Sequence, residues 1–536
     1  MLSVTAGVAL IIMAVIDFFR SRESDNRTLF RVSAAVWLVS GILLLVWQNA
    51  TMPVVAAIAG IALIINGIFH LVSAVRQADD RFFNATLGLA AVIGGIVAIA
   101  WPDVTIFVVS LVIGLRLVWT GVELVVEAIR GSAVAETTRG RSIRRNIAAI
   151  VALVAAVAVA AVTIWFNAAS PKPDAFYTAP DSVPDTPGQL LRVESFDRDI
   201  PENAQAWRIL YTTTRDDGQA AVASALVIAP TAASDTPRPV VAWAHGTTGF
   251  APGCAPSVLE HPFVAASTPA VPETIERGWV MVATDYIGLG TTGPHPYLIG
   301  QGEARSVLDS VRAAHQMSQL SLADETVVWG HSQGGHSALW TGLIAPEYAP
   351  ELTISGIAAL APASDLPGLI EKLRSSAAGS VLLSFVLAAY TQTYPEVTYD
   401  VARWPARLPL KEMAQRCLAE PETYVSVVQA LIIGNDYLTS EPDTGALGRR
   451  LAENTPSGRI SAPVLLAQGE ADGVISPIVQ AGYAKAQCAA GTNLDFRTYP
   501  GLDHVPLVTS PDSAAVPELL EWTADRFAGK PAATTC

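Results

Sequence analysis

Gly330-His331-Ser332-Gln333-Gly334-Gly335 fits the pattern G-x-S-x-G. In this pattern a serine sits on a tight turn between a strand and a helix, and the flanking glycines let the backbone and the helix approach closely. Residues 326–329, before the motif, are β-branched and apolar like a buried strand, and residues 336–344, after it, begin a helical pattern. This context predicts a nucleophile elbow with Ser332 at its tip.

A serine hydroxyl is a weak nucleophile and needs a neighbouring base, which in turn needs an acid to orient it. The chain has eight histidines. His504 is the candidate that follows both the elbow and the last predicted strand, and it fits the order serine, acid, histidine. Asp472, just past a predicted strand, is the expected acid, and Glu470 is its close competitor.

The oxyanion that forms during acyl transfer needs backbone N–H donors. One is expected from Gln333, which follows the serine. The other is expected from the loop after the predicted strand 239–244, where Thr247 is the first choice and Thr248 the second.

Short apolar runs alternate with helical patterns through the second half of the chain, which predicts a mostly parallel sheet of the α/β hydrolase type. Residues 365–458 interrupt the alternation and are expected to form an inserted, mostly helical cap within a hydrolase domain at 189–530. The apolar segment 377–390 is expected to cover Ser332 and to bind an acyl chain through Leu383 and Phe385, the alternative being a helix buried against the core. The predicted strands are 222–229, 239–244, 279–284, 326–329, 354–360, 464–467 and 496–499, and the predicted helices are 302–318, 334–344 and 514–527.

The first half of the chain has a different composition. Residues 1–168 contain long apolar runs near the length needed to cross a bilayer, which predicts a multi-pass membrane domain. Residues 169–188, rich in Pro, Asp, Ser and Thr, are expected to be an extended linker. The six predicted spans are 2–19, 32–50, 54–75, 82–101, 105–128 and 147–167.

Apart from Arg116, within the predicted fifth span, the arginines of this half lie in alternate loops. The loops after the first, third and fifth spans carry them, whereas residues 49–53 and 102–104 carry none. The positive-inside rule therefore predicts that the N-terminus and everything after the sixth span lie outside the cytoplasm.

Charge also divides the chain. Residues 1–168 hold 12 basic and 9 acidic residues, so of the total of 34 and 48 the remainder holds 22 and 39, a net charge of −17. An acidic second half argues against nucleic acid as a partner. No residues have metal-ligand spacing, so no metal or organic cofactor is expected. The four cysteines, an even number in the extracytoplasmic half, favour two disulfides.

The membrane half also repeats itself. Residues 47–76 align without gaps to 101–130, at an offset of 54 residues, with matching Trp, Thr, Gly, Leu and Arg positions. This part resembles the HdeD-like acid-resistance membrane proteins, a resemblance that covers about residues 1–165 and implies no chemistry.

The second half resembles the secreted lipase family that includes fungal lipase A, over about residues 190–530. The resemblance implies the triad Ser332, Asp472 and His504. It also implies the disulfides Cys254–Cys417 and Cys488–Cys536, since the family pairs a cysteine of a CAPS segment with one in the cap. The stretches that carry it are HGTTGFAPGCAPS (245–257), GWVMVATDYIGLGTTGPHPYL (278–298), LDSVRAA (308–314), GHSQGG (330–335) and QGEADGVISP (468–477).

The sequence therefore predicts an integral plasma-membrane protein whose extracytoplasmic domain is a serine ester hydrolase, a lipase or carboxylesterase, with a lipid or other ester as substrate. An acyltransferase would use the same triad. A second alternative is a membrane stress or transport protein in which the hydrolase is an accessory.

Overall fold

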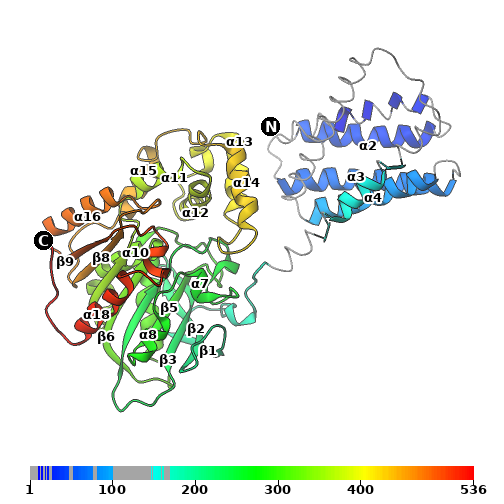
Figure 1. Cartoon of the computed structure of the whole chain (residues 1–536). Coiled ribbons are helices and arrows are strands. Elements are labelled where there is room, and N and C mark those ends of the chain that lie inside the picture. The colour runs from blue at the N-terminus through cyan, green and yellow to red at the C-terminus, as the bar shows by residue number, and fades with distance from the viewer. Residues whose placement is uncertain are drawn as a thin grey trace. The chain divides into compact units, whose positions relative to one another are not determined.

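The computed structural model describes residues 27–46, 52–76, 81–100 and 170–536, with short further pieces between 10 and 22 and between 146 and 161. The chain divides into two compact units, Met1–Ala169 and Ser170–Cys536 (Figure 1). The described helices of the first unit are α2 (Arg27–Val46), α3 (Met52–Arg76) and α4 (Arg81–Ala100).

Two stretches among the described residues are long and apolar enough to cross a membrane, Ala56–Arg76 and Arg81–Ala100. They correspond to the third and fourth predicted spans, and α2 holds a shorter apolar stretch, Arg31–Leu43. The described residues thus give two candidate spans and not about six. The predicted fifth span, 105–128, lies outside the described residues, and the first and sixth are described only in pieces.

Helices α3 and α4 pack as an antiparallel hairpin through facing glycines. A Cβ atom on Gly60 would lie 2.7 Å from the carbonyl oxygen of Gly95, and one on Gly67 would lie 2.7 Å from that of Gly88. Neither contact leaves room for a side chain, so the two backbones touch directly. Close packing through small residues is the usual way in which helices associate in lipid, where burial of apolar surface gives no driving force.

The second unit is built on one nine-stranded sheet with the order β1-β2-β3-β5-β4-β6-β7-β8-β9. The pairs β1–β2, β2–β3 and β3–β5 are antiparallel, and all later pairs are parallel. The strands are β1 (Leu190–Phe196), β2 (Ala204–Thr214), β3 (Ala220–Pro230), β4 (Arg238–Ala244), β5 (Val280–Ile287), β6 (Leu322–His331), β7 (Thr353–Leu360), β8 (Val464–Gly469) and β9 (Leu494–Tyr499).

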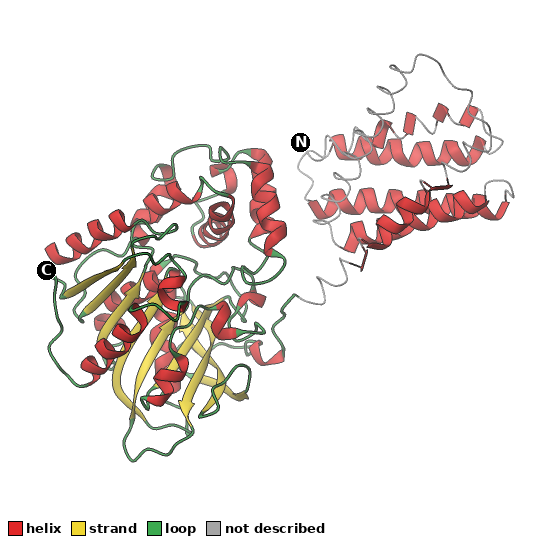
Figure 2. Cartoon of the chain, in the orientation of Figure 1, coloured by secondary structure: helices red, strands yellow, loops and turns green. Residues whose placement is uncertain are grey.

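Helices cover both faces of this sheet (Figure 2). One apolar cluster joins the sheet to α9 (Gly300–Ala314), α10 (Gln333–Tyr348) and α16 (Pro477–Ala489). A second cluster, on the opposite face, joins it to α8 (Val271–Glu276), α17 (Pro506–Thr509) and α18 (Ala515–Phe527). The short elements η1 (Ala175–Tyr177), η2 (Pro252–Cys254) and α7 (Pro262–Ala265) complete this part of the unit. The α/β hydrolase prediction for the second half is confirmed.

The chain between β7 and β8 forms a helical cap with its own apolar cluster. In Figure 1 these yellow-green to yellow helices gather at one end of the sheet. The cap consists of α11 (Leu366–Leu373), α12 (Ala377–Thr393), η3 (Tyr399–Val401), α13 (Trp404–Met413), α14 (Thr423–Ile433) and α15 (Gly445–Asn454).

Residues 170–188, predicted to be an extended linker, pack against the hydrolase. Phe176 and Tyr177 are buried in a small apolar cluster, and the Tyr177 hydroxyl donates to the backbone oxygen of Ser257 at 3.0 Å. Arg208 stacks 4.4 Å from the centre of the Phe176 ring and pairs with Asp174 at 2.9 Å. Phe176 and Tyr177 therefore anchor this segment to the hydrolase, which its polar composition did not indicate.

Candidate active site

Ser332 occupies a strained turn between β6 and α10. Its φ of 58° and ψ of −117° are unusual for a residue with a side chain. The flanking glycines make the turn possible: a Cβ on Gly330 would lie 1.9 Å from the backbone oxygen of Gly334, and a Cβ on Gly334 would lie 1.9 Å from that of Ala244. The Ser332 N–H donates to the Leu360 oxygen at 2.9 Å, which fixes the turn to β7.

The three residues expected to form a triad lie in one hydrogen-bonded line. Ser332 Oγ is 2.8 Å from His504 Nε2, and His504 Nδ1 is 2.8 Å from Asp472 Oδ2. Ser332 follows β6, Asp472 follows β8 and His504 follows β9, so the ends of three parallel strands bring together residues up to 172 positions apart. A base that bonds a hydroxyl on one side and a carboxylate on the other is arranged for nucleophilic catalysis.

The carboxylate of Asp472 is held on both oxygens. Oδ1 accepts from the N–H groups of Val474 and Ile475 at 2.8 and 2.7 Å, and Oδ2 accepts from the Gln468 amide at 2.9 Å as well as from His504. Burial raises the pKa of Asp472, but the hydrogen bonds from His504, Ile475 and Gln468 outweigh burial and hold this pKa below its ordinary value of 3.8. Asp472 is therefore ionised at neutral pH.

Glu470, the competing acid, does not reach the imidazole. It is exposed, and its carboxylate accepts from Thr498 at 2.9 Å. The neighbouring carboxylate of Asp503 accepts from the N–H groups of Gly473 and His504, at 2.9 and 2.7 Å, and so ties the acid loop to the histidine loop.

His331 supports His504 and does not compete with it for the Ser332 proton. Its Nε2 donates to the backbone oxygen of His504 at 3.0 Å, and the two rings lie 4.7 Å apart. Burial, followed by the nearby imidazole of His504, lowers the pKa of His331 to about 3, so it is neutral at neutral pH. Its position beside the serine gave no signal of this supporting role.

The loop 245–249 lies against the elbow. A Cβ on Gly246 would be 3.9 Å from Ser332 Cβ. Within the described part of the chain, no acceptor takes the N–H groups of Thr247, Thr248 or Gln333, which leaves these three donors available beside the serine. The side chain of Thr247 bonds to the Tyr297 hydroxyl at 2.8 Å, so the loop is held by its side chains while its N–H groups remain open.

Two bonds hold the cap next to this loop. The disulfide Cys254–Cys417 joins the segment after the loop to the cap, and the N–H of Leu418 donates to the oxygen of Thr248 at 2.7 Å. The second disulfide, Cys488–Cys536, ties the C-terminal segment to α16. Both pairs are those implied by the family resemblance.

Leu383 and Phe385 do not form an exposed apolar face. Both side chains are 0% exposed and belong to the apolar cluster of the cap. These two side chains fit the alternative of a buried helix, because the neighbouring cap helices cover α12, and their contact with an acyl chain stays a prediction. Phe385 instead packs edge-on against Tyr297 at 5.8 Å, so it supports the residue that bonds Thr247.

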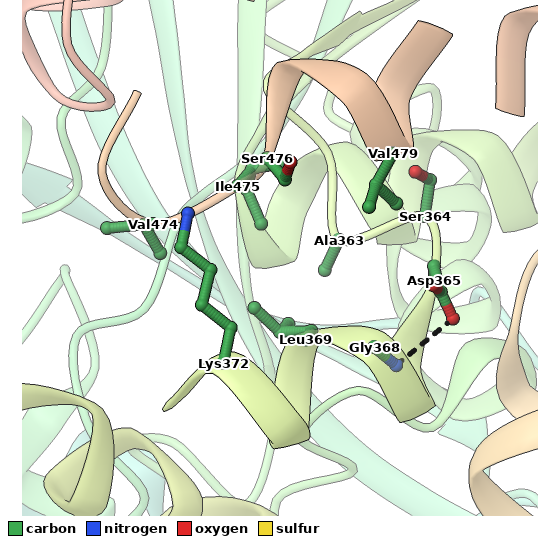
Figure 3. Close-up of a pocket in the computed structure, with 10 residues that line it drawn as sticks. All are labelled: Ala363, Ser364, Asp365, Gly368, Leu369, Lys372, Val474, Ile475, Ser476 and Val479. Atoms are coloured by element: carbon green, nitrogen blue, oxygen red, sulfur yellow. Dashed lines mark hydrogen bonds between the residues drawn. The ribbon is translucent and has the colours of Figure 1, made fainter. Parts of the chain in front are cut away.

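A shallow pocket that is partly open to solvent lies next to residues that bond the triad. Residues on two sides of this pocket hydrogen-bond to the triad residues. The Ala363 N–H donates to the backbone oxygen of Ser332 at 3.2 Å, and the N–H groups of Val474 and Ile475 donate to the Asp472 carboxylate. Figure 3 shows Lys372 extending from α11 toward the segment that carries Val474. The lining residues are Ala363, Ser364, Asp365, Gly368, Leu369, Lys372, Val474, Ile475, Ser476 and Val479. Among the described residues, no group of three or more histidines, cysteines or acids could hold a metal ion.

The family model for secretory lipases matches residues 256–535, just over half of the chain. The chain belongs to the secretory lipase family. A short repeat of unknown function matches 32–85 and 86–161, whose starts differ by 86 − 32 = 54 residues, the offset seen in the sequence.

Several curated relatives resemble this secretory lipase family member over most of their length. Lipase A of Moesziomyces aphidis is 26% identical over 68% of this chain and 83% of that protein. The probable inactive lipase MT1628 of Mycobacterium tuberculosis is 29% identical over 67% and 83%, and the secreted triacylglycerol lipase LIP4 of Malassezia globosa is 27% identical over 68% and 83%.

Solved structures agree on the fold. Candida antarctica lipase A matches with a TM-score of 0.56 and 22% identity, over 69% of this chain and 89% of that chain. A mutant form of the rice cell wall degrading esterase LipA from Xanthomonas oryzae matches with a TM-score of 0.52 and 19% identity, over 65% and 100%. At these identities the likeness concerns the fold alone.

Proposed function

We propose that this chain is a membrane-anchored serine ester hydrolase that acts on lipid esters outside the cytoplasm. The observation that carries the proposal is the line of two 2.8 Å hydrogen bonds from Ser332 through His504 to Asp472. Membership of a lipase family supports ester hydrolysis, but one relative is named a probable inactive lipase, so the geometry of these residues carries more weight than membership.

The reaction would proceed through an acyl-enzyme. Ser332 Oγ attacks the ester carbonyl carbon while His504 Nε2 accepts the hydroxyl proton, and Asp472 stabilises the resulting imidazolium. The N–H groups of Thr247 and Gln333 donate to the oxyanion, with Thr248 as the second choice for the loop donor. Collapse breaks the bond to the alcohol, which takes the proton from Nε2. Water then repeats both steps on the acyl-enzyme and releases the carboxylic acid.

The proposed division of the chain is a multi-pass membrane domain at 1–168 and a hydrolase at 189–530 with its cap at 365–458. The glycine packing of α3 against α4 supports helix association in lipid, and the arginine-free alternate loops support an extracytoplasmic hydrolase. A reporter active only outside the cytoplasm, fused after Cys536, should be active. Activity from a cytoplasm-only reporter at that site would refute this orientation.

The decisive test of the chemistry compares wild type with Ser332→Ala on esters of increasing acyl length. Loss of a serine nucleophile lowers kcat on the order of 10⁶-fold. Ser310→Ala is a control for the loss of a serine hydroxyl, because Ser310 is buried away from the triad and its hydroxyl bonds to the Val307 oxygen of its own helix. Turnover by Ser332→Ala within tenfold of wild type would reject the assignment.

Two further measurements separate the alternatives. Product analysis with an added alcohol distinguishes hydrolysis from acyl transfer, since an acyltransferase would form a new ester in place of the free acid. Deletion of residues 1–168 should leave ester turnover intact if that half is an anchor. If deletion abolished turnover by the folded hydrolase unit, the membrane repeat would be part of the enzyme and not only its tether.

A further inference from the structure

A group of buried polar side chains lies directly behind the nucleophile elbow and has no part in the mechanism above. It consists of Glu303 from the first turn of α9, Gln333 and His336 from the first turn of α10, and His295 from the preceding loop. Glu303, His295 and His336 are 0% exposed and Gln333 is 1% exposed. A carboxylate removed from water at this depth must be offset by hydrogen bonds, so its partners indicate its role.

Glu303 bonds to the loop before α9 and to the first turn of α10. Its Oε1 accepts from the Leu298 N–H at 3.0 Å and from the side-chain amide of Gln333 at 2.8 Å. Its Oε2 lies 2.8 Å from Nδ1 of His336. Glu303 therefore holds two residues of the first turn of α10, one of which directly follows Ser332.

The protons of this group can be assigned from its acceptors. His336 Nε2 lies 2.8 Å from the backbone oxygen of Asn454, which can only accept, so Nε2 carries a hydrogen. One further proton lies between Nδ1 and Glu303. An amide in place of the carboxylate could supply that proton to Nδ1 while its oxygen kept both Oε1 contacts.

His295 fixes the other hydrogen of the Gln333 amide. His295 Nδ1 lies 3.2 Å from the Ile287 oxygen and donates to it, so the Nε2 lone pair accepts from Gln333 at 3.0 Å. Burial lowers the pKa of His295 to about 3, which agrees with a neutral ring. A flipped amide would turn its oxygen toward a carboxylate and a lone pair, so the Gln333 side chain has one orientation.

We propose that Glu303 is a positioning residue for ester hydrolysis, which anchors the Gln333 side chain and thereby fixes the direction of the Gln333 backbone N–H toward the oxyanion. The inference rests on the proposed function, because the direction of the Gln333 N–H matters only if this group donates to the oxyanion of that mechanism. The preceding residue, Ser332, is held at a φ of 58°, and rotation of the Ser332–Gln333 peptide would relax this strain and misdirect the donor. The anchored side chain opposes that rotation.

The test uses full-length enzyme, with kcat expressed per active site titrated by a phosphonate ester. Glu303→Leu keeps the volume but releases Gln333. We expect kcat to fall about 10- to 100-fold, less than the loss from removing an oxyanion donor, with KM within about twofold. Glu303→Gln keeps every hydrogen bond described above and should restore kcat to within about threefold of wild type.

A purely structural role for Glu303 would lower the melting temperature and the fraction of titratable sites but not kcat per site. Asp309→Leu is the matched control, because Asp309 is another fully buried carboxylate of α9 and bonds Arg312 and Tyr348 away from the elbow. It should lose stability and keep kcat.

Gln333→Met decides the question if Glu303→Leu does not fold, since it keeps the backbone N–H and removes only the anchor. The proposal expects the same fall in kcat. Wild-type kcat per site in a folded Glu303→Leu or Gln333→Met enzyme would overturn it. Ser332→Ala in the same assay tests the proposed function separately, because its full activity would reject the mechanism whatever Glu303 does.

Discussion

Replacing Cys254 and Cys417 with serine should cost this protein both stability and turnover. The disulfide joins the segment that follows the oxyanion loop to the cap, and the residue after Cys417 bonds the oxygen of Thr248 at 2.7 Å. Without the bond, the cap can move away from the loop that carries the Thr247 and Thr248 donors. The other disulfide, Cys488–Cys536, provides an internal control, since it lies between α16 and the C-terminus.

The loop lengths set the expected stabilities. The bonds span 163 and 48 residues. The chain-entropy model assigns roughly 2.1 + 1.5R ln n cal/mol/K to a loop of n residues, which gives about 5 kcal/mol for the first bond and about 4 kcal/mol for the second at 25 °C. The two loops do not overlap in sequence, so each can be removed without changing the length of the other. The two double-serine variants should therefore differ in unfolding free energy by only about 1 kcal/mol.

The assay combines denaturant unfolding with ester kinetics at a temperature where both variants are folded. The variant lacking Cys254–Cys417 should lose kcat at least tenfold per titrated site, whereas the variant lacking Cys488–Cys536 should keep it. If both variants keep wild-type kcat, the cap does not hold the oxyanion loop. If both lose kcat in proportion to stability, the first bond has no special link to the site.

Three other perturbations probe separate parts of the site. Gly334→Ala would put a Cβ 1.9 Å from the backbone oxygen of Ala244, so kcat should fall at least about 100-fold, whereas Gly482→Ala, with nothing within 4 Å, should have no effect; equal kinetics would contradict the clash. Asp472→Asn should lower kcat on the order of 10⁴-fold. Because the pKa of Asp472 is held below 3.8, its ionised form stabilises the fold above that pH. The difference in free energy of unfolding between wild type and Asp472→Asn should therefore shrink as the pH falls through the lowered pKa. A constant difference from neutral to acid pH would refute this. Phe385→Asp would bury an unpaired carboxylate, so the melting temperature should drop and turnover of short and long esters should fall together; a selective loss of long-chain turnover at unchanged melting temperature would support the acyl-binding prediction.

Residues 326–344 could be interpreted from the sequence because their signals are local. A strand, a turn and a helix follow one another, and the glycines that the turn requires are neighbours of Ser332. The seven predicted strands are all present in the sheet. Strands β1 and β2 were not predicted, since β1 is mostly half-exposed and mixes polar with apolar residues, and half of β2 does the same.

Contacts between segments that are distant along the chain could not be predicted from sequence patterns. Asp472 and Glu470 stand two residues apart with the same chemistry, and only the path of the loop after β8 turns one toward His504 and the other toward Thr498. The apolar helix 377–390 has the same composition whether solvent, substrate or other cap helices cover it, and in the structure the cap helices do.

The sequence by itself determined the elbow, the order of the proposed triad and the division into an apolar and an acidic half, because each is recorded in neighbouring residues or in composition. The tertiary structure alone decided which acid meets the histidine, that Phe176 and Tyr177 anchor residues 170–188, and that Glu303 lies behind Gln333. The physical reason is that a hydrogen bond or a buried contact depends on distance in space, and the sheet brings together groups that have no fixed spacing along the chain.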